Sequence, residues 1–176
     1  GGIAGMATAL GLKKANFAVQ LLAPAYTPWG LASHQYHPRV YALSAASRAF
    51  LERLGVWSLM RAERITAVEG MELYGDGDGF MQLDAWQNAQ SDLTWIVESG
   101  EMERVLHQAL QVYNVPWKTD LFARLSPKGV VTASGAELPA DLIIGADGAR
   151  SQVRAAAHIN HDCKPYGYSG VVAHLD

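Results

Sequence analysis

The sequence predicts an α/β fold: a Rossmann-like domain interrupted by a mainly antiparallel β-sheet region. Three observations carry this prediction. A glycine-rich start at 1–5 leads into a helical segment and an apolar strand, residues 141–154 read as strand, glycine turn and helix start, and the part between them contains hairpin turns. The 176 residues are an ordinary length for one domain and long enough for a hydrophobic core.

The first glycines form the second half of a dinucleotide fingerprint, Gly-x-Gly-x-x-Gly. Gly2 takes the middle position, where a pyrophosphate requires bare backbone, and Gly5 takes the last, where the helix packs closely against the strand. The Ala-rich residues 6–12 predict that helix, and the apolar residues 17–22 predict the next strand. The first glycine and the first strand of the motif are missing, so we expect a partial domain and a truncated chain.

One position departs from the fingerprint. An Asp or Glu that binds the ribose hydroxyls is expected after the second strand, but the chain continues with Ala23 and Pro24. A hydrogen bond to a charged group contributes about 1.5–3 kcal/mol, so its loss weakens adenosine binding roughly tenfold to hundredfold. The departure predicts reduced affinity rather than lost binding, because a backbone group or a residue of the next loop can take over the ribose.

A second nucleotide-type pattern lies near the end of the chain. The apolar run 142–144 predicts a parallel strand, and the Gly-Ala-Asp-Gly turn at 145–148 precedes a helix start at Ser151. The free N–H groups and the dipole of a helix N-terminus favour a phosphate, and Arg150 and Arg154 add positive charge nearby. Taken alone, the pattern favours an ordinary strand, turn and helix, and the other motifs reverse that preference.

The segment 39–57 contains the third motif. It opens with Arg39 shortly before Ala-Leu-Ser, and it closes with Leu-Gly-Val-Trp. Gly55 stands where the C-terminal cap of a helix belongs. A stripe of apolar residues at helical spacing predicts a core helix between these ends, and it consists of Ala46, Phe50, Leu51 and Leu54.

The remaining elements are two hairpins and a helix. Strands at 68–74 and 80–83 flank a glycine-rich turn, and strands at 130–132 and 137–139 form a second hairpin that leads back to residue 141. Residues 101–111 place apolar side chains at i, i+3, i+4, i+7 and i+8, which predicts an amphipathic helix packed on a sheet.

No metal site is predicted. The Gly-Asp-Gly-Asp-Gly turn at 75–79 lacks the third oxygen ligand and the Glu at the twelfth position that an EF-hand calcium loop requires. His158, His161 and Cys163 are close in sequence, but a structural zinc site needs a fourth ligand and the chain has no other Cys. We interpret these three as residues of a surface loop.

The three motifs, in this order, resemble those of the ubiquinone-biosynthesis branch of FAD-dependent aromatic hydroxylases, which have a fold like that of para-hydroxybenzoate hydroxylase. The resemblance also runs through Trp-Ile-Val-Glu-Ser at 95–99 and through residues 166–173. It therefore extends over nearly the whole chain, and it corresponds to the N-terminal half of the family.

The resemblance implies FAD as cofactor and NAD(P)H as its reductant. It implies a monooxygenase in which molecular oxygen adds to the reduced flavin and the hydroperoxyflavin hydroxylates a prenylated phenol or quinol on the route to ubiquinone. It assigns no catalytic acid, base or nucleophile. The cofactor-binding residues that it implies are Gly2, Gly5, Arg39, Asp147 and Gly148, with Asp147 near the phosphate and ribityl side of the flavin.

The resemblance also divides the chain into segments of an FAD-binding domain and of a substrate-side β region. Residues 1–66 are the first FAD-binding part, 67–98 begin the substrate-side region, 99–160 are the second FAD-binding part with the Gly-Ala-Asp-Gly turn, and 161–176 begin a second substrate-side segment that is truncated.

Composition limits the partners. A net charge of −3 with no cluster of Lys and Arg argues against nucleic acid, and no apolar run approaches the roughly 18 residues of a membrane span. With 49% hydrophobic and 18% charged residues and a mean hydropathy of +0.01, we expect a cytoplasmic protein. A prenylated substrate is compatible with peripheral contact between the protein and the inner membrane. A homo-oligomer or a biosynthetic complex is also compatible with the sequence.

Two alternatives remain at this point. A nicotinamide-dependent dehydrogenase shares the glycine fingerprint, but it explains Arg39 and the Gly-Ala-Asp-Gly turn poorly. The chain can also be a catalytically inactive nucleotide-binding fragment, because part of the fingerprint and the second half of the family are missing. We expect these residues alone to be inactive, whatever the complete protein does.

Overall fold

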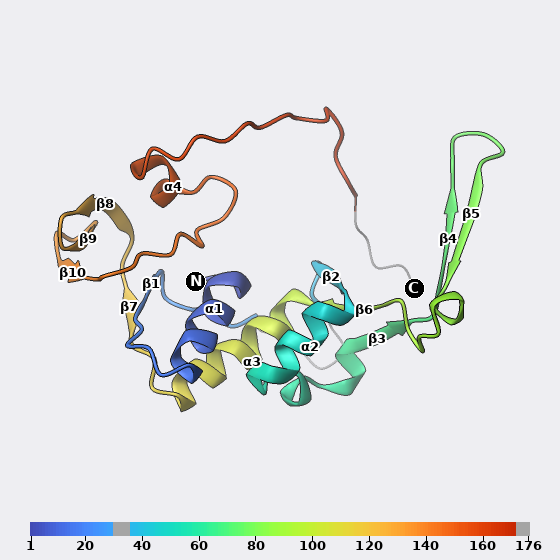
Figure 1. Ribbon diagram of the computed structural model, residues 1–176, viewed down its shortest axis with the longest axis horizontal. Helices are drawn as coiled ribbons and strands as arrows, with labels where there is room; N and C mark the ends of the chain where they lie inside the picture. The colour runs from blue at the N-terminus through green and yellow to red at the C-terminus, as the bar shows by residue number, and fades with distance from the viewer. Residues whose placement is uncertain (30–35, 172–176) are drawn as a thin grey trace. The chain divides into compact units, whose positions relative to one another are not determined.

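The computed structural model describes residues 1–29 and 36–171 of the chain. The chain forms two compact units: unit one consists of Gly1–Pro28 and Leu106–Asp176, and unit two consists of Trp29–Val105. The long helix α3 (Ser99–Val112) contributes residues to both units (Figure 1). The four domain segments expected from the sequence stay a prediction.

Unit one is built around a parallel pair of strands. β1 (Leu21–Ala23) pairs with β7 (Trp117–Thr119). The helix α1 (Ile3–Lys14) precedes β1, as the glycine-rich start predicts, and the side chains of Met6 and Leu10 on α1 are completely buried. Since parallel strands with helices between them are the building blocks of Rossmann-like domains, this part of the predicted α/β fold is confirmed.

Unit one also contains an antiparallel sheet of three strands in the order β10-β9-β8. These are β8 (Phe122–Ser126), β9 (Gly129–Thr132) and β10 (Glu137–Pro139), so the second predicted hairpin is confirmed. Gly129 has a φ of +151°, and a Cβ there would lie 2.1 Å from a carbonyl oxygen of β10, so the turn requires glycine. The short helix α4 (Gln152–Ala156) lies against β8.

Two strands expected from the sequence differ in the structure. The strand expected at 17–22 is confined to Leu21–Ala23, because only these residues pair with β7. The strand expected at 142–144 does not form, since no strand among the described residues pairs with it. Two of its three side chains are correspondingly open to solvent, with Leu142 74% and Ile144 49% exposed. An apolar run predicts burial, but pairing depends on a partner that the run itself does not encode.

Unit two contains a three-stranded antiparallel sheet in the order β2-β6-β3. The edge strands are β2 (Val40–Leu43) and β3 (Ile65–Val68), and two 3₁₀ helices, η1 (Trp57–Leu59) and η2 (Ala62–Arg64), precede β3. The central strand β6 (Thr94–Glu98) is the most buried, with four of its five residues buried.

The helix predicted within 39–57 is α2 (Ala45–Leu54). The side chain of Ser44 accepts a hydrogen bond at its N-terminus, and Gly55 ends it with a φ of +76°, as the sequence predicts. The predicted apolar stripe is only half correct: Leu51 and Leu54 are buried, whereas Ala46 and Phe50 are exposed.

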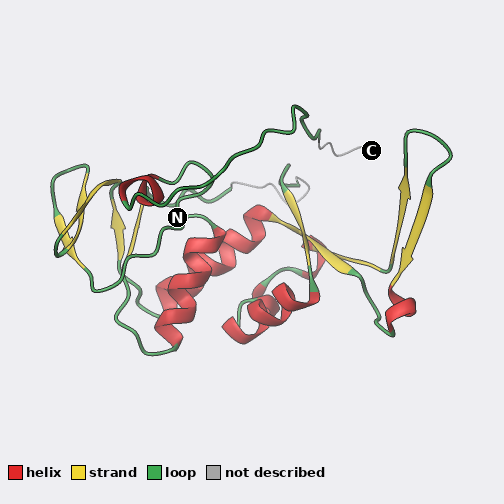
Figure 2. Cartoon of the chain, turned by 45° about the horizontal axis from the view of Figure 1, so that its top comes forward, coloured by secondary structure: helices red, strands yellow, loops and turns green. Residues whose placement is uncertain are grey.

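The first predicted hairpin is also confirmed. Figure 2 shows β4 (Gly70–Tyr74) and β5 (Phe80–Asp84) as a two-stranded sheet, followed by the 3₁₀ helix η3 (Ala85–Asn88). The register pairs Met71 with Leu83 and Leu73 with Met81, which places four apolar side chains on one face of the hairpin.

The helix predicted at 101–111 is α3, one to two residues longer at each end. Its five predicted apolar residues are all buried: Met102, Val105, Leu106, Ala109 and Leu110. No helix in residues 1–29 and 36–171 has the length and apolar character needed to cross a bilayer.

Candidate functional site

The N-terminus of α1 has the geometry that suits an anion. Gly2 is the N-cap, with extended backbone at φ −84° and ψ −178°, and no side chain caps the helix. The first turn contains no acidic residue, so the free N–H groups and the positive end of the helix dipole have no anionic neighbour within that turn. A Cβ on Gly2 would meet no protein atom within 4 Å, so the space in front of this backbone is unfilled by protein.

The same helix start lies at the carboxyl end of β1. A Cβ on Gly1 would stand 2.8 Å from the Cβ of Ala23 and 3.6 Å from the ring of Trp117. A Cβ on Gly5 would lie 3.6 Å from Ala146 and 3.9 Å from Leu21, so the last fingerprint glycine faces both the strand and the Gly-Ala-Asp-Gly turn. The two glycine-rich motifs, which are distant in sequence, therefore meet at one helix end.

Ala23, where the fingerprint expects an acid, is buried at this end of the strand pair. The first residue after β7 is Asp120, whose backbone N–H donates to the Ala23 carbonyl oxygen at 3.2 Å. Hydrogen bonds from Ser134, Thr132 and Leu121 lower the pKa of the Asp120 carboxyl to about 2. An ionised carboxylate thus follows the neighbouring strand, although Ser134 and Leu121 already occupy part of its acceptor capacity.

Asp147 caps the helix that follows it. One oxygen accepts a hydrogen bond from the Ser151 hydroxyl, and the other accepts the N–H groups of Gln152 and Val153 at 2.7 and 3.2 Å. Burial raises the pKa of Asp147, but these hydrogen bonds outweigh it and lower the pKa. The sequence suggested a phosphate at this helix start, which is wrong for these two amides because Asp147 already binds them.

Asp147 nevertheless keeps capacity for a ligand. Asp147 is exposed, and the two oxygens of its carboxylate offer about four acceptor positions. Gly148, the next residue, has a φ of +89°, a conformation that strongly favours glycine. The turn is therefore held in one shape by a helix cap on one side and a glycine on the other.

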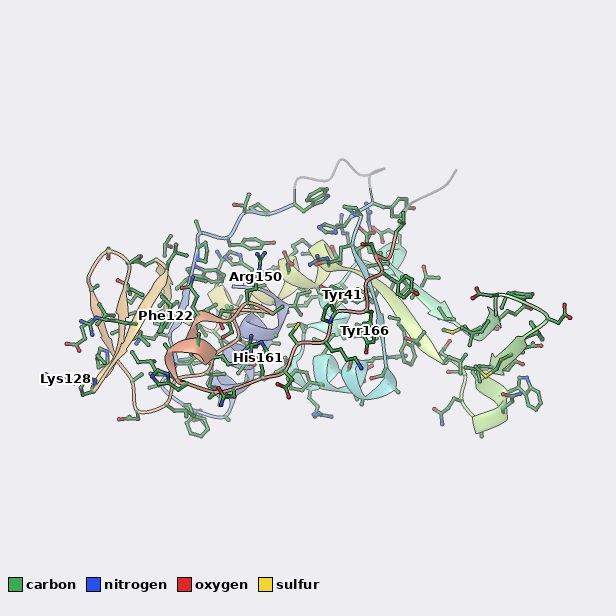
Figure 3. The ribbon with its side chains drawn as sticks, turned by 90° about the horizontal axis from the view of Figure 1, so that it is seen from above. Tyr41, Phe122, Lys128, Arg150, His161 and Tyr166 are labelled. Carbon is green, nitrogen blue, oxygen red and sulfur yellow. The ribbon has the colours of Figure 1, made fainter. Side chains whose placement is uncertain are left out.

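The two arginines of this region serve different roles. Arg154 donates to the Ala149 carbonyl oxygen at 2.7 Å and lies 3.1 Å from the Nε2 atom of His161, whereas Arg150 is exposed (Figure 3). His158, His161 and Cys163 do not come together as metal ligands, and no group of residues suited to a metal ion exists in the described part of the chain.

Arg39, the fifth predicted cofactor residue, belongs to unit two. It directly precedes β2, its side chain is exposed, and its carbonyl oxygen accepts the N–H of Ser99 at 2.9 Å. Gly2, Gly5, Asp147 and Gly148 belong to unit one. The structure therefore brings together four of the five predicted residues within one unit.

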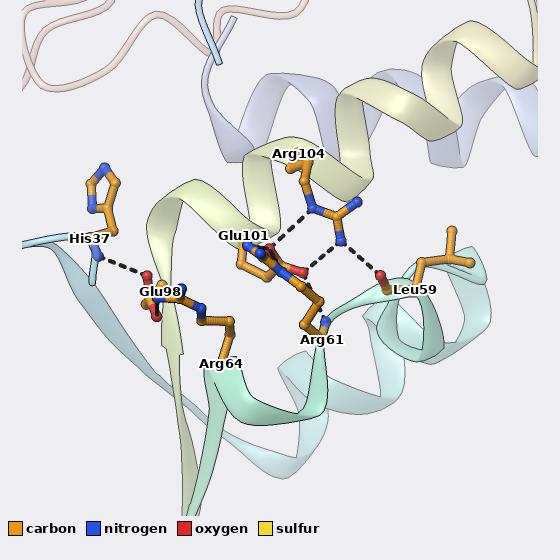
Figure 4. Close-up of polar contacts among 7 residues, drawn as sticks. All are labelled: His37, Leu59, Arg61, Arg64, Glu98, Glu101 and Arg104. Carbon is orange, nitrogen blue, oxygen red and sulfur yellow. Dashed lines mark hydrogen bonds and ion pairs between the residues drawn. The ribbon is translucent and has the colours of Figure 1, made fainter. Parts of the chain in front are cut away.

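A network of charged side chains around two buried glutamates in unit two was missed by the sequence reasoning (Figure 4). Glu101 is 1% exposed and accepts hydrogen bonds from the Arg61 guanidinium at 2.8 Å and from the Arg104 guanidinium at 2.6 Å. Glu98 pairs with Arg64 at 2.9 Å, and both side chains are buried. A Glu at the start of a helix resembles an ordinary solvated residue in sequence. Two signals pointed to Glu98: it ends an apolar strand, and it belongs to the stretch 95–99 that resembles the family.

Comparison with solved structures gives the class of the fold. A probable FAD-dependent monooxygenase from Pseudomonas aeruginosa, PqsL, matches with a TM-score of 0.71 and 19% identity over 94% of this chain and 45% of that one. The 2-methyl-3-hydroxypyridine-5-carboxylic acid oxygenase matches with a TM-score of 0.68 and 22% identity over 89% of this chain and 40% of that one. The chain thus has the Rossmann-like α/β fold of FAD-dependent monooxygenases.

The sequence relatives of the chain are ubiquinone-biosynthesis hydroxylases, although no family model matches the chain. The chain is 33% identical to 3-demethoxyubiquinol 3-hydroxylase of Escherichia coli, over 96% of this chain and 45% of the relative. It is 29% identical to the ubiquinone hydroxylase UbiL of Rhodospirillum rubrum and 28% identical to the mitochondrial ubiquinone biosynthesis monooxygenase COQ6 of Caenorhabditis elegans, over 98% of this chain in both cases. The resemblance to ubiquinone-biosynthesis hydroxylases is therefore confirmed, and the chain spans 41–45% of the length of these three relatives.

Proposed function

We propose that the complete protein is an FAD-dependent, NAD(P)H-using monooxygenase that hydroxylates a prenylated phenol or quinol in ubiquinone biosynthesis. The relatives named above support the reaction class and the substrate class. The observation that carries the proposal is the uncapped start of α1, with Gly2 open in front of it, at the carboxyl end of the parallel pair β1–β7. Nucleotides bind at this end of parallel strands in Rossmann-like domains.

The residues present fit FAD. The backbone N–H groups at the start of α1 suit a pyrophosphate, and the missing side chain of Gly2 lets it approach. Asp147 can accept hydrogen bonds from hydroxyl groups of the cofactor with the acceptor positions that Ser151, Gln152 and Val153 leave open. We assign Gly5 and Gly148 to the shape of this site and Arg39 to the flavin.

The flavin would supply the oxygen-activating chemistry when bound, with NAD(P)H as the source of electrons. The side chains of this chain would bind and orient the cofactor, and none is assigned to proton transfer. The substrate is a small aromatic molecule with a prenyl chain, and molecular oxygen is the second substrate. The prenyl chain supports transient contact with a membrane, and we propose a location in the cytoplasm or at the inner membrane. Association in a homo-oligomer or a biosynthetic complex is compatible with this location.

A titration with FAD tests the proposal. We expect the complete protein to bind FAD with a saturable change in flavin fluorescence, and calorimetry gives the stoichiometry. NAD is titrated in parallel. Binding of NAD without FAD would favour a dehydrogenase, and binding of neither would argue against a nucleotide site at α1. The 176-residue chain alone provides a further comparison, because we do not expect it to be active.

The role of Asp147 in FAD binding can be separated from its role as a helix cap. We expect Asp147→Ala in the complete protein to lower FAD affinity about tenfold, because a hydrogen bond to a charged group contributes about 1.5–3 kcal/mol. Ser151→Ala is the matched control, since Ser151 also caps α4 by accepting the N–H of Arg154 at 2.9 Å. Flavin content after desalting and titration of both variants are the measurements. Equal losses of affinity in the two variants would mean that Asp147 acts through the helix alone.

A further inference from the structure

A buried ion pair in unit two is connected to the strand that carries Arg39. Glu98 is 4% and Arg64 is 5% exposed, and their side chains are joined at 2.9 Å. The other carboxylate oxygen of Glu98 accepts the backbone N–H of His37 at 2.7 Å. One buried carboxylate therefore holds both a guanidinium and the backbone two residues before Arg39 (Figure 4).

The backbone of Arg39 is fixed from several directions by the same group of residues. Its N–H donates to the Nδ1 atom of His37 at 3.0 Å, and its carbonyl oxygen accepts the N–H of Ser99, the residue after Glu98, at 2.9 Å. Val40, the next residue, lies opposite Glu98 in the β2–β6 register. The guanidinium of Arg64 also lies 4.8 Å from the centre of the Tyr36 ring. The side chain of Arg39, by contrast, is exposed.

The buried pair of Glu98 and Arg64 contributes more to the fixed positions of its neighbours than to the stability of the fold. The hydrogen bond and charge of Glu98 raise the pKa of Arg64, so this guanidinium stays ionised although it is buried. Burying two charges has a desolvation cost that offsets most of their attraction, and apolar residues of similar volume are often as stable. An ion pair does, however, restrict geometry, because the Glu98 oxygens accept hydrogen bonds only from donors in fixed positions. One of these donors is the backbone N–H of His37.

We propose that Glu98, fixed by Arg64, is a positioning residue that sets the direction in which Arg39 is presented to the flavin. The inference rests on the proposed function, which assigns Arg39 to the flavin. Glu98 itself touches neither cofactor nor substrate in this account. It acts through the His37 amide and through the pairing of β6 with β2.

A double-mutant cycle tests the proposal, with the FAD dissociation constant of the complete protein as its readout. We expect Arg39→Ala to weaken FAD binding about tenfold and Glu98→Gln about fivefold. If Glu98 acts through Arg39, the double variant binds FAD no more than about twofold more weakly than Arg39→Ala alone. Multiplication of the two single effects would overturn the proposal, because a general loosening of the fold weakens binding whether or not Arg39 is present.

Control variants separate an effect of Glu98 through Arg39 from the loss of a nearby charge and from misfolding. Glu63→Gln removes an exposed charge next to Arg64 and is expected to leave FAD binding unchanged. If Glu98→Gln does not fold, the Glu98→Gln/Arg64→Met variant removes both buried charges together and is tested in its place, with the same expected coupling to Arg39. Unchanged affinity in Arg39→Ala, with FAD still bound by the wild type, would overturn this inference and leave the proposed function standing. Absence of FAD binding in the wild type would overturn both.

Discussion

Gly2→Val is expected to weaken FAD binding by about hundredfold or more, a loss of at least about 2.7 kcal/mol. The reason is steric. The backbone at Gly2 is extended and suits any residue, and a Cβ there meets no protein atom within 4 Å. The protein therefore accepts the valine, whereas a pyrophosphate lying against the same backbone does not. The main effect is therefore expected in the affinity for FAD, and the effect on folding is expected to be smaller.

Fluorescence titration with FAD and a thermal melt of the apoprotein measure the two quantities separately. Valine is a poorer N-cap than glycine, so a stability loss of up to about 1 kcal/mol is expected and has to be measured. Gly77→Val is the matched control: Gly77 also has no atom within 4 Å of an added Cβ, but it lies in the β4–β5 turn. Normal FAD affinity in Gly2→Val would place the pyrophosphate elsewhere.

The glycine pattern predicted this part of the molecule well because its physical requirements are local. The spacing of Gly2 and Gly5 determines where α1 begins and which face of it approaches β1, and both features are present in the structure. The helical stripe of α3 is equally local, and all five of its apolar residues are buried. A cap such as Gly55 is similar, since the left-handed conformation restricts the residue type directly.

Features that depend on a distant partner were predicted less well. The apolar run 142–144 has the composition of a strand, but strand formation needs a paired neighbour, and none pairs with it among the described residues. The helix N-terminus after Ser151 seemed free for a phosphate because the sequence does not show that the Asp147 carboxylate folds back onto it. Half of the α2 stripe is exposed for the same reason: periodicity defines a face, and the neighbouring elements decide how much of it is covered.

The buried glutamates are the clearest example of a feature that depends on a distant partner. Glu101 lies in the first turn of α3, where an acidic residue is favoured by the helix dipole in any protein. Its two arginine partners are 40 residues upstream and three residues downstream, and only folding brings Arg61 to it. These contacts join α3 to η1 and to the residue before η2, because Arg104 also donates to the Leu59 carbonyl oxygen at 2.9 Å and Arg61 directly precedes η2.

Glu101→Gln is expected to lower the free energy of unfolding by about 2 kcal/mol at pH 7. Burial raises the pKa of the Glu101 carboxyl, but hydrogen bonds from Arg104 and Arg61 outweigh it and lower the pKa from 4.5 to about 2. Each unit of that shift corresponds to roughly 1.4 kcal/mol of stability. The arginine side chains are 41% and 39% exposed, so solvent screens part of the attraction, and we reduce the expected loss accordingly.

The pH dependence follows from the sign of the same shift. Because the folded pKa is lower than the unfolded one, the contribution of Glu101 is fully present above about pH 4.5 and is lost as the pH falls towards 2. Urea unfolding at pH 7 and at pH 3 should therefore show a smaller difference for Glu101→Gln than for the wild type. Glu52→Gln is the control, since Glu52 and Arg48 form an exposed pair at i,i+4 that contributes less than about 0.5 kcal/mol. If Glu101→Gln resembles that control at both pH values, the buried carboxylate does not hold α3 in place.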